Sequence, residues 1–163
     1  MAKIELLVGN IGSGRRRFAK ERAAEGAVVV SRDLMNRAFH GGVDVFDPEL
    51  RGVYMAVAQA TIVAAVHNGR DVVVIDDELH RREVRQQYTD IANLADAEVV
   101  AVVFDRQDPE LHARRQYDSG LCRPGVNYDQ CLTAAQRIAT RWEDPDIDQE
   151  SIASVVPAVP VSV

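Results

Sequence analysis

The stretch Leu7-Val8-Gly9-Asn10-Ile11-Gly12-Ser13-Gly14-Arg15-Arg16-Arg17-Phe18 decides the fold of this chain. Apolar residues lead into a glycine-rich turn and a helix-favouring run leads out of it, so the stretch predicts a strand, a loop and a helix in succession. The glycines have the spacing of the loop G-x-x-x-x-G-K-[ST], in which backbone N–H groups hold phosphates. The residues expected to bind an anion are therefore Gly9, Asn10, Ile11, Gly12, Ser13, Gly14, Arg15 and Arg16.

Two positions of this loop depart from the standard pattern. Arg15 stands where a lysine reaches the terminal phosphates, and Arg16 stands where a hydroxyl holds Mg²⁺. A guanidinium about 4 Å from a divalent cation is repelled by roughly 8 kcal/mol at an effective dielectric of about 20. Either Arg16 turns away and carboxylates and water hold Mg²⁺, or the loop binds phosphate without a metal in the usual place.

A plain glycine-rich turn followed by a basic surface helix is the alternative. Three consecutive arginines, Arg15–Arg17, at a helix N-terminus oppose the helix dipole by roughly 0.3–1 kcal/mol each when exposed. An anion bound on the loop would reverse this penalty, which favours the binding interpretation. Successive helical residues point about 100° apart, so no more than one or two of these arginines can face a ligand.

Size and composition limit the class of protein. The chain has 163 residues, of which 47% are hydrophobic and 27% charged, and this predicts one globular domain over residues 1–163. The formal charge of −6 argues against non-specific coating of nucleic acid, although a local basic groove stays open. Cys122 and Cys131 lack metal-ligand spacing and are expected to be reduced thiols of a cytoplasmic protein. Apolar runs look too short to span a membrane, and no signal-peptide core is visible, so no membrane partner is expected.

Short β-branched runs alternate with helical segments along the chain. Strands are expected at Ile4–Val8, Ala27–Val30, Asp71–Ile75 and Glu98–Phe104. Helices are expected at Arg15–Glu25, Asp33–Phe39, Pro48–Asn68, Arg81–Ala95 and Pro109–Tyr117. A flexible lid-type loop over 118–126, a helix over 127–142 and a weak edge strand after Ser151 complete the chain. This alternation predicts an α/β fold, a parallel sheet with helices on both faces.

Carboxylates follow two of the expected strands. Asp33 comes after one, and Asp76-Asp77-Glu78 comes directly after another. Because ligands bind at the carboxyl ends of the strands in open parallel sheets, these side chains are expected beside the glycine-rich loop. Asp33 could accept a proton from an attacking hydroxyl, with a helix N-cap as the equal alternative. Asp76 or Asp77 could hold Mg²⁺ or cap a helix, and the adjacent negative charges require a metal or an arginine nearby.

Arginines flank the expected lid loop. Arg114, Arg115 and Arg123 could each supply positive charge to a transferring phosphoryl group, or each could lie on the surface in solvent. The four histidines share no ligand-like spacing, so a zinc site is not expected.

Several segments follow one another in a fixed order along the chain. They are the strand and loop Lys3–Gly14, the tripeptide Ser31-Arg32-Asp33, the run Val74-Ile75-Asp76-Asp77-Glu78-Leu79, the helical stretch Glu110–Arg115 and the turn Arg141-Trp142-Glu143-Asp144-Pro145. In this order and spacing they resemble the polynucleotide 5′-kinase branch of the P-loop kinases. Its corresponding motifs are N/S-R-D, I-I-D-x-T/N-N-L, a lid-bearing helix and R-F-E-x-P, and the resemblance covers most of the chain.

The resemblance implies a P-loop sandwich with a five-stranded parallel sheet in the order 2-3-1-4-5. It also implies γ-phosphoryl transfer from ATP or GTP to a 5′-hydroxyl of nucleic acid or a related alcohol. Asp33 would be the general base, Arg32 would contact the acceptor, and Arg115 or Arg123 would be the lid arginine. The family's arginine three residues beyond the base falls on Asn36 here, and the loop lysine and hydroxyl are replaced.

Three hypotheses follow from this resemblance and its departures. The first is an active kinase. The second is a catalytically impaired pseudo-kinase that binds nucleotides or nucleic-acid ends as a regulatory module. The third, weaker hypothesis is a structural accessory protein that uses an empty loop.

Overall fold

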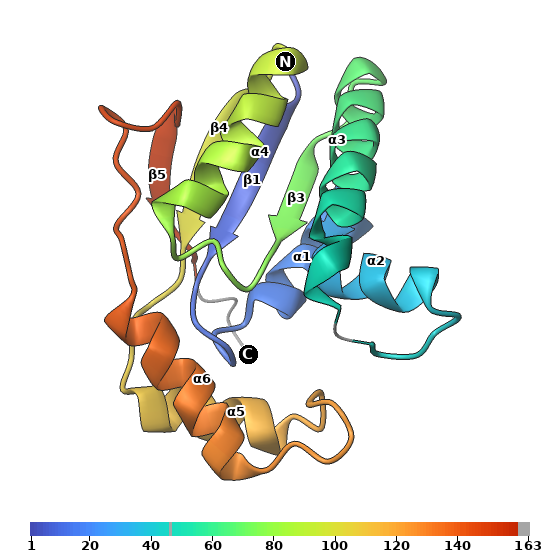
Figure 1. Ribbon diagram of the computed structural model, residues 1–163. Coiled ribbons are helices and arrows are strands. Elements are labelled where there is room, and N and C mark those ends of the chain that lie inside the picture. The colour runs from blue at the N-terminus through green and yellow to red at the C-terminus, as the bar shows by residue number, and fades with distance from the viewer. Residues whose placement is uncertain (46, 160–163) are drawn as a thin grey trace.

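The computed structural model describes residues 1–45 and 47–159, and a five-stranded parallel sheet forms its centre (Figure 1). The strands are β1 (Lys3–Val8), β2 (Val28–Ser31), β3 (Val72–Ile75), β4 (Glu98–Val103) and β5 (Ser154–Pro157). They lie in the order β2-β3-β1-β4-β5, which confirms the predicted order. The strands are parallel, so their carboxyl ends meet at one edge of the sheet.

Helices cover both faces of this sheet. In chain order they are α1 (Arg15–Ala24), α2 (Arg32–Phe39), the short 3-10 turn η1 (Pro48–Leu50), α3 (Arg51–His67), α4 (Arg82–Leu94), α5 (Pro109–Asp118) and α6 (Tyr128–Thr140). α3 and α4 pack on the face that contains Ile4, Leu6 and Val8, and α1 packs on the face that contains Leu7. β1 serves both faces because successive side chains of a strand point to opposite sides.

Polar caps begin three of these helical segments. Asp47 and Asp108 each accept a hydrogen bond from the backbone N–H two residues further on, at 3.0 and 2.8 Å. Asn127 forms a capping box with Gln130 at the start of α6. The helix expected from Pro48 begins as η1 and continues as α3, so the proline starts a tighter first turn.

α3 is the most apolar of the described helices, and one side of it packs in the core. By length and composition alone, Pro48–His67 could cross a membrane, a run that the sequence analysis above did not expect. Its buried residues Ala58, Ile62 and Ala65 recur with helical spacing and pack in the core beside β1 and β3. Packing against the sheet therefore accounts for part of this apolar composition.

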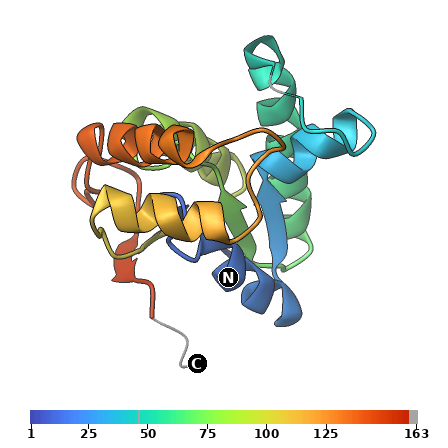
Figure 2. The same cartoon turned by 90° about the horizontal axis from the view of Figure 1, so that it is seen from below.

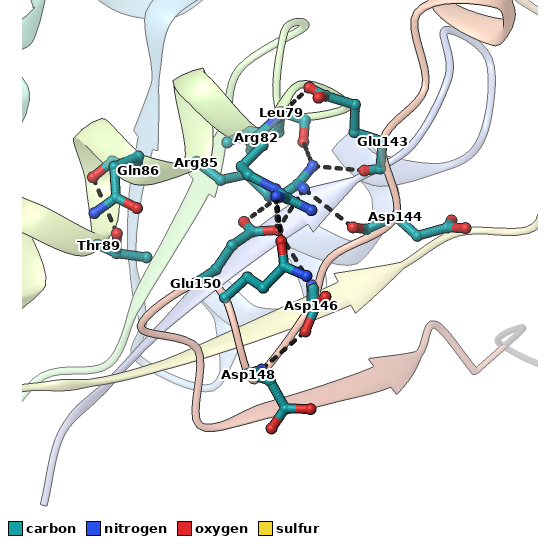
Figure 3. Close-up of polar contacts among 11 residues, drawn as sticks. Leu79, Arg82, Arg85, Gln86, Thr89, Glu143, Asp144, Asp146, Asp148 and Glu150 are labelled. Atoms are coloured by element: carbon teal, nitrogen blue, oxygen red, sulfur yellow. Dashed lines mark hydrogen bonds and ion pairs between the residues drawn. The ribbon is translucent and has the colours of Figure 1, made fainter.

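A buried arginine of α4 holds the segment that leads to β5. Arg85 is 0% exposed, and its guanidinium donates to both carboxylate oxygens of Glu150, each at 2.7 Å (Figure 3). It also donates to the carbonyl oxygens of Leu79 and Glu143, each at 2.9 Å. Because Glu143 belongs to the turn Arg141–Pro145, this one side chain fixes that turn against α4.

α5 and α6 form a helical pair at the carboxyl end of the sheet (Figure 1). Seen from below, they lie side by side (Figure 2). They pack through small buried side chains, Ala113 on α5 and Cys131 and Ala135 on α6. The expected lid loop, residues 118–126, connects them, with Asp118 as the last residue of α5. The pair therefore lies across the strand ends at which the predicted site residues gather.

Candidate functional site

A cleft of about 570 Å³ opens at the carboxyl end of the sheet, with α5 on one side and α2 and the start of α3 on the other. Its charged lining consists of eight arginines, Arg15, Arg16, Arg17, Arg32, Arg51, Arg81, Arg115 and Arg123, and six carboxylates, Asp33, Asp47, Asp76, Asp77, Glu78 and Glu83. The lining therefore has an excess of positive charge in a chain whose formal net charge is −6. A cleft lined in this way attracts anions.

The glycine-rich loop packs closely against α5 and α6. Gly12 has a φ of 61°, and a Cβ there would lie 2.5 Å from the carbonyl oxygen of His112 in α5. Asn10 is buried, and its side chain donates to the carbonyl oxygen of Ala135 in α6 at 3.0 Å. The loop is therefore held by the helical pair, and only a glycine at position 12 allows this approach.

The second half of the loop faces the cleft, whereas Gly9 and Asn10, which were also expected to bind the anion, do not line it. Ile11, Gly12, Ser13 and Gly14 line it, while a Cβ at Gly9 would lie 2.6 Å from Ser13 Oγ, which leaves no room for a side chain beneath the loop. Gly14 is the N-cap of α1 and has no side chain to occupy the first N–H groups of that helix. The N-terminus of a helix in this position favours an anion.

Arg15 reaches from the loop to the end of β3. Its side chain is 7% exposed, and its guanidinium donates to Asp77 Oδ1 at 2.7 Å and to the carbonyl oxygen of Asp76 at 3.3 Å. The Asp77 side chain is 62% exposed, but atoms crowd around its carboxylate, and this partial desolvation alone would raise its pKa. The guanidiniums around it, that of Arg15 first, outweigh this effect and hold the pKa below its usual value. Asp77 is therefore an ionised partner of Arg15.

Asp76 is buried at the end of β3, and both of its carboxylate oxygens are engaged. Oδ1 accepts the backbone N–H of Glu78 at 3.0 Å and lies 3.4 Å from the guanidinium of Arg32. Oδ2 accepts the hydroxyl of Tyr88 at 3.1 Å, and burial together with the Asp76 charge raises the pKa of Tyr88, so its hydroxyl stays a donor. The cation expected beside these carboxylates is thus supplied by arginine.

Asp33 lies in the first turn of α2 and faces α1. The N-cap of α2 is Ser31, whose side chain accepts the backbone N–H of Leu34 at 3.3 Å, so the N-cap alternative for Asp33 is wrong. Asp33 Oδ2 instead accepts a hydrogen bond from Arg16 at 2.9 Å and lies 3.8 Å from Arg37. The arginine at the hydroxyl position of the loop therefore holds the candidate base.

The two candidate lid arginines approach the cleft from α5 and from the lid loop. Arg115 donates to Gln107 Oε1 at 2.6 Å, and Arg123 forms an ion pair with Asp44 Oδ2 at 2.9 Å. The second pair joins the lid loop to the segment between α2 and η1. Arg114 faces away, with its guanidinium 5.5 Å from the centre of the tyrosine ring that begins α6. Arg115 and Arg123 thus stay the two candidates.

Two side chains that the sequence analysis did not single out also line the cleft. Arg51, at the start of α3, donates to Gln87 Oε1 at 2.9 Å. Tyr54, one turn later, donates to Asn36 Oδ1 at 2.6 Å. Asn36 stands at the position where the polynucleotide 5′-kinase branch has an arginine. The sequence contains a signal for these two residues. Asp47-Pro48 marks the start of a helix, and the first turn of that helix lies at the same edge of the sheet as the glycine-rich loop.

The residues at the strand ends do not fit a magnesium ion as they are arranged. Both oxygens of Asp76 already accept hydrogen bonds, Asp77 is paired with Arg15, and Arg16 stands in place of the hydroxyl. Within residues 1–45 and 47–159, no group of three or more His, Cys, Asp or Glu side chains is placed to hold a metal ion. The arginines would first have to move before Asp76 or Asp77 could coordinate Mg²⁺.

Residues 4–117 match the sequence model of the AAA domain family, which is more than half of the chain. The chain belongs to the AAA domain family. No curated protein matches this AAA domain.

Solved structures with the fold of this AAA domain include kinases. A Chloroflexus aurantiacus protein, provisionally described as a kinase, has a TM-score of 0.68 at 10% identity, over 96% of this chain and 84% of that one. APS kinase CysC of Mycobacterium tuberculosis, solved with AMPPNP and APS, has a TM-score of 0.61 at 16% identity, over 99% and 90%. A chain of the Pnkp1/Rnl/Hen1 RNA repair complex has a TM-score of 0.60 at 21% identity. The match covers 87% of this chain and 46% of that one. The AAA domain therefore has a P-loop kinase-like fold.

Proposed function

We propose that this AAA domain binds ATP or GTP at the loop Gly9–Arg16 and transfers the terminal phosphoryl group to a hydroxyl. The acceptor is a nucleic-acid 5′ end or a related alcohol. The observation that carries the proposal is the position of Asp33, whose carboxylate meets Arg16 of the loop inside one cleft at 2.9 Å. A general base must lie within hydrogen-bonding reach of the acceptor hydroxyl and beside the donor phosphate, and the contact of Asp33 with Arg16 of the loop supports this role.

The structural relatives favour a kinase over a catalytically impaired regulatory module. One relative is a named kinase solved with AMPPNP, and another belongs to an RNA repair complex. The second relative supports a nucleic-acid end as the acceptor.

The pair of Arg16 and Asp33 must open before Asp33 can act. A triphosphate on the loop offers Arg16 more negative charge than a single carboxylate, and guanidiniums bind phosphate oxygens through paired hydrogen bonds. Once Arg16 turns to the phosphate, Asp33 can accept the proton of the acceptor hydroxyl. The hydroxyl oxygen then bonds to the terminal phosphorus while the bond from that phosphorus to its bridging oxygen breaks, and the nucleoside diphosphate leaves.

Other arginines of the cleft supply positive charge on both sides of the transferred group. Arg32 lies beside Asp76 near the acceptor side, with Arg51 behind it at the start of α3. Arg115 lies on α5, and Arg123 reaches from the lid loop to Asp44 between α2 and η1. Positive groups fixed in place before the reaction stabilise charge that develops on the transferred phosphoryl.

Asp33→Asn is the test of this function. Transfer of labelled phosphate from ATP and from GTP is measured on a 5′-hydroxyl oligonucleotide and on small polyols. Loss of the base is expected to lower kcat by about 10²–10⁴-fold, because a general base contributes about that much. Nucleotide affinity is expected to stay the same or rise, because Arg16 loses its carboxylate partner and is freed for phosphate.

Asp129→Asn is the matched control, since Asp129 is an exposed carboxylate in the first turn of α6. This variant should keep the wild-type rate. Equal kcat values for Asp33→Asn and wild type would remove Asp33 from the mechanism. Nucleotide binding without transfer to any acceptor would overturn the kinase proposal itself.

A further inference from the structure

Carboxylates at three positions face the phosphate-binding loop, and an arginine accompanies each of them. The pairs are Asp33 with Arg16 at 2.9 Å, Asp77 with Arg15 at 2.7 Å and Asp76 with Arg32 at 3.4 Å. Carboxylates and a hydroxyl at this edge hold Mg²⁺ in the standard phosphate-binding loop. In this chain, guanidiniums contact these carboxylates, and Arg16 stands at the position of the hydroxyl ligand.

The charges of this cluster oppose a divalent cation and favour a bare polyphosphate. A metal ion that entered would lie among three positive side chains, and the carboxylates that could coordinate it are already hydrogen-bonded. A polyphosphate without metal would bring negative charge to the same guanidiniums. Part of its charge would then be offset by the excess of arginines over carboxylates in the cleft.

These arginines still have donors to offer. A guanidinium has five N–H donors, and Arg15 uses its two terminal nitrogens on Asp77 and on the carbonyl oxygen of Asp76, one contact each. Arg16 is half exposed, at 46%, and its contact with Asp33 is a single one. Each can therefore contact phosphate oxygens, and planar guanidiniums match these oxygens in pairs.

We infer that the triphosphate bound at the proposed nucleotide site is free of Mg²⁺. Its phosphates are neutralised by Arg15, Arg16 and Arg32 in place of the metal. The inference rests on the proposed function, because it concerns the ligand of that same site. It names the ligand as a metal-free nucleoside triphosphate.

The test compares binding with and without the metal. ATP and GTP are titrated calorimetrically into the full chain in buffer with EDTA and in buffer with MgCl₂. The Kd in EDTA is expected to be equal to or lower than the Kd in MgCl₂, because Mg²⁺ removes part of the negative charge that the arginines recognise.

Arg16→Thr is the informative variant, because it restores the hydroxyl of the standard loop and removes one guanidinium. Its Kd in EDTA is expected to rise by roughly tenfold or more over its Kd in MgCl₂, the size of one lost charged contact. Lys20→Thr is the matched control, since Lys20 is an exposed cation on the same helix and does not line the cleft. It should keep the wild-type response to EDTA.

The outcomes separate this inference from the function on which it rests. Binding that requires MgCl₂ overturns the metal-free ligand and leaves the kinase proposal standing. Binding in neither buffer removes the nucleotide site and both proposals with it. If Arg16→Thr loses its circular dichroism spectrum, the wild-type comparison alone still decides.

A different observation concerns the lid loop. Cys122 of the lid loop and Cys131 of α6 are free thiols, and their Sγ atoms lie 3.4 Å apart. Cys131 is buried and Cys122 is partly exposed. We propose that these thiols form a reversible disulfide that fastens the lid loop to α6. Arg123 follows Cys122 directly, so the crosslink would also fix the backbone beside one candidate lid arginine.

The oxidant of this step is a small-molecule disulfide such as oxidised glutathione. The Cys122 thiolate attacks one sulfur of oxidised glutathione, whose S–S bond breaks and releases one glutathione thiolate. The Cys131 thiolate then attacks the Cys122 sulfur, the protein S–S bond forms and the second glutathione thiolate leaves. The protein loses two electrons and two protons, and oxidised glutathione is reduced to two thiols.

Free thiols and intact mass measure the crosslink after incubation with oxidised glutathione. Wild type is expected to lose both thiols without retaining glutathione, and dithiothreitol should restore them. Cys131→Ser should instead retain one glutathione on Cys122, because no second thiol displaces it. Wild-type protein that keeps glutathione, or that keeps both thiols free, would show that the pair does not close.

Discussion

Single arginines determine the electrostatics of this site. Arg15 is buried beside the exposed side chain of Asp77, and its guanidinium holds the pKa of that carboxyl below its usual value. A carboxyl with a lowered pKa contributes stability that is present above its unfolded pKa of about 3.9 and is lost as pH falls through the folded value. The pair of Arg15 and Asp77 is therefore fully formed at neutral pH, and a ligand meets it in that state.

Gly12→Ala tests whether the loop depends on its contact with α5. Gly12 has a φ of 61°, and a Cβ there would lie 2.5 Å from a backbone oxygen of His112, which cannot move away as a side-chain end could. Gly41→Ala is the matched control, because Gly41 has a φ of 64° with nothing within 4 Å. The left-handed conformation alone costs about 1–2 kcal/mol, so Gly41→Ala should lose that much in urea unfolding. Gly12→Ala should lose more, and an equal loss would show that the contact is unimportant.

The sequence reveals which residues lie in the cleft more readily than which atoms they contact. Spacing alone places Arg15, Arg16 and Asp33 near one another, because strand ends of a parallel sheet share an edge. Arg16 contacts Asp33, 17 residues away in the chain, and Arg15 contacts a carboxylate 62 residues away. Because these partners are distant in the sequence, no local pattern predicts which carboxylate each arginine contacts. The cap of α2 was ambiguous for a different, local reason. Ser31 and Asp33 are both residue types that cap helices, and in the structure Ser31 is the N-cap.

At the scale of elements, α5 joins the loop, the lid and the cleft. His112 of α5 is buried behind the loop, and its Nε2 accepts the backbone N–H of Gln107 at 3.1 Å. Burial, and then the charge of Arg115, lower the pKa of His112 below its usual value. The helix therefore keeps a neutral imidazole against the phosphate-binding loop.

Protonation of His112 is expected to loosen this contact. A histidine whose folded pKa is lowered contributes stability that is present above about pH 6.5 and is lost as pH falls from there toward the folded pKa. The free energy of unfolding should therefore fall between pH 6.5 and pH 5, by at most about 1.4 kcal/mol per pH unit for this one group. Urea titrations at several pH values measure the slope, which should be shallower in His112→Asn. His67→Gln, at the exposed end of α3, should keep the wild-type slope, and a His112→Asn slope equal to wild type would contradict the assignment.

Element positions were predictable because each has a local signal. The run Val72-Val73-Val74 is fully buried as an uninterrupted apolar strand should be, and Asp108 caps α5 as its place before a proline indicates. The change from η1 to α3 was not predictable, because it depends on how the chain after Pro48 meets the sheet. The edge strand β5 tolerates Pro157 because nothing described pairs with its outer side.

At the scale of the whole molecule, one long-range ion pair secures the last part of the fold. Arg85 and Glu150 lie 65 residues apart in the chain and are both buried, at 0% and 3% exposed. Periodicity alone could indicate that this face of α4 is buried, but not that an arginine occupies it. A buried guanidinium requires a carboxylate and carbonyl acceptors, and these come from the segment that leads into β5 (Figure 3).

Arg85→Met is therefore expected to destabilise the entire chain. Removal of Arg85 leaves the buried charge of Glu150 with only its longer contact to Arg82, at 3.6 Å, which is expected to cost about 3–5 kcal/mol in urea unfolding. Arg17→Ala, which removes an exposed pair with Glu21 on α1, should cost no more than about 1 kcal/mol. The double variant Arg85→Met with Glu150→Met should be more stable than Arg85→Met alone, because it also removes the buried charge that has lost its main partner. If the double variant is the less stable of the two, Glu150 still stabilises the fold without Arg85, through Arg82 at 3.6 Å and the backbone N–H of Asp146 at 3.1 Å.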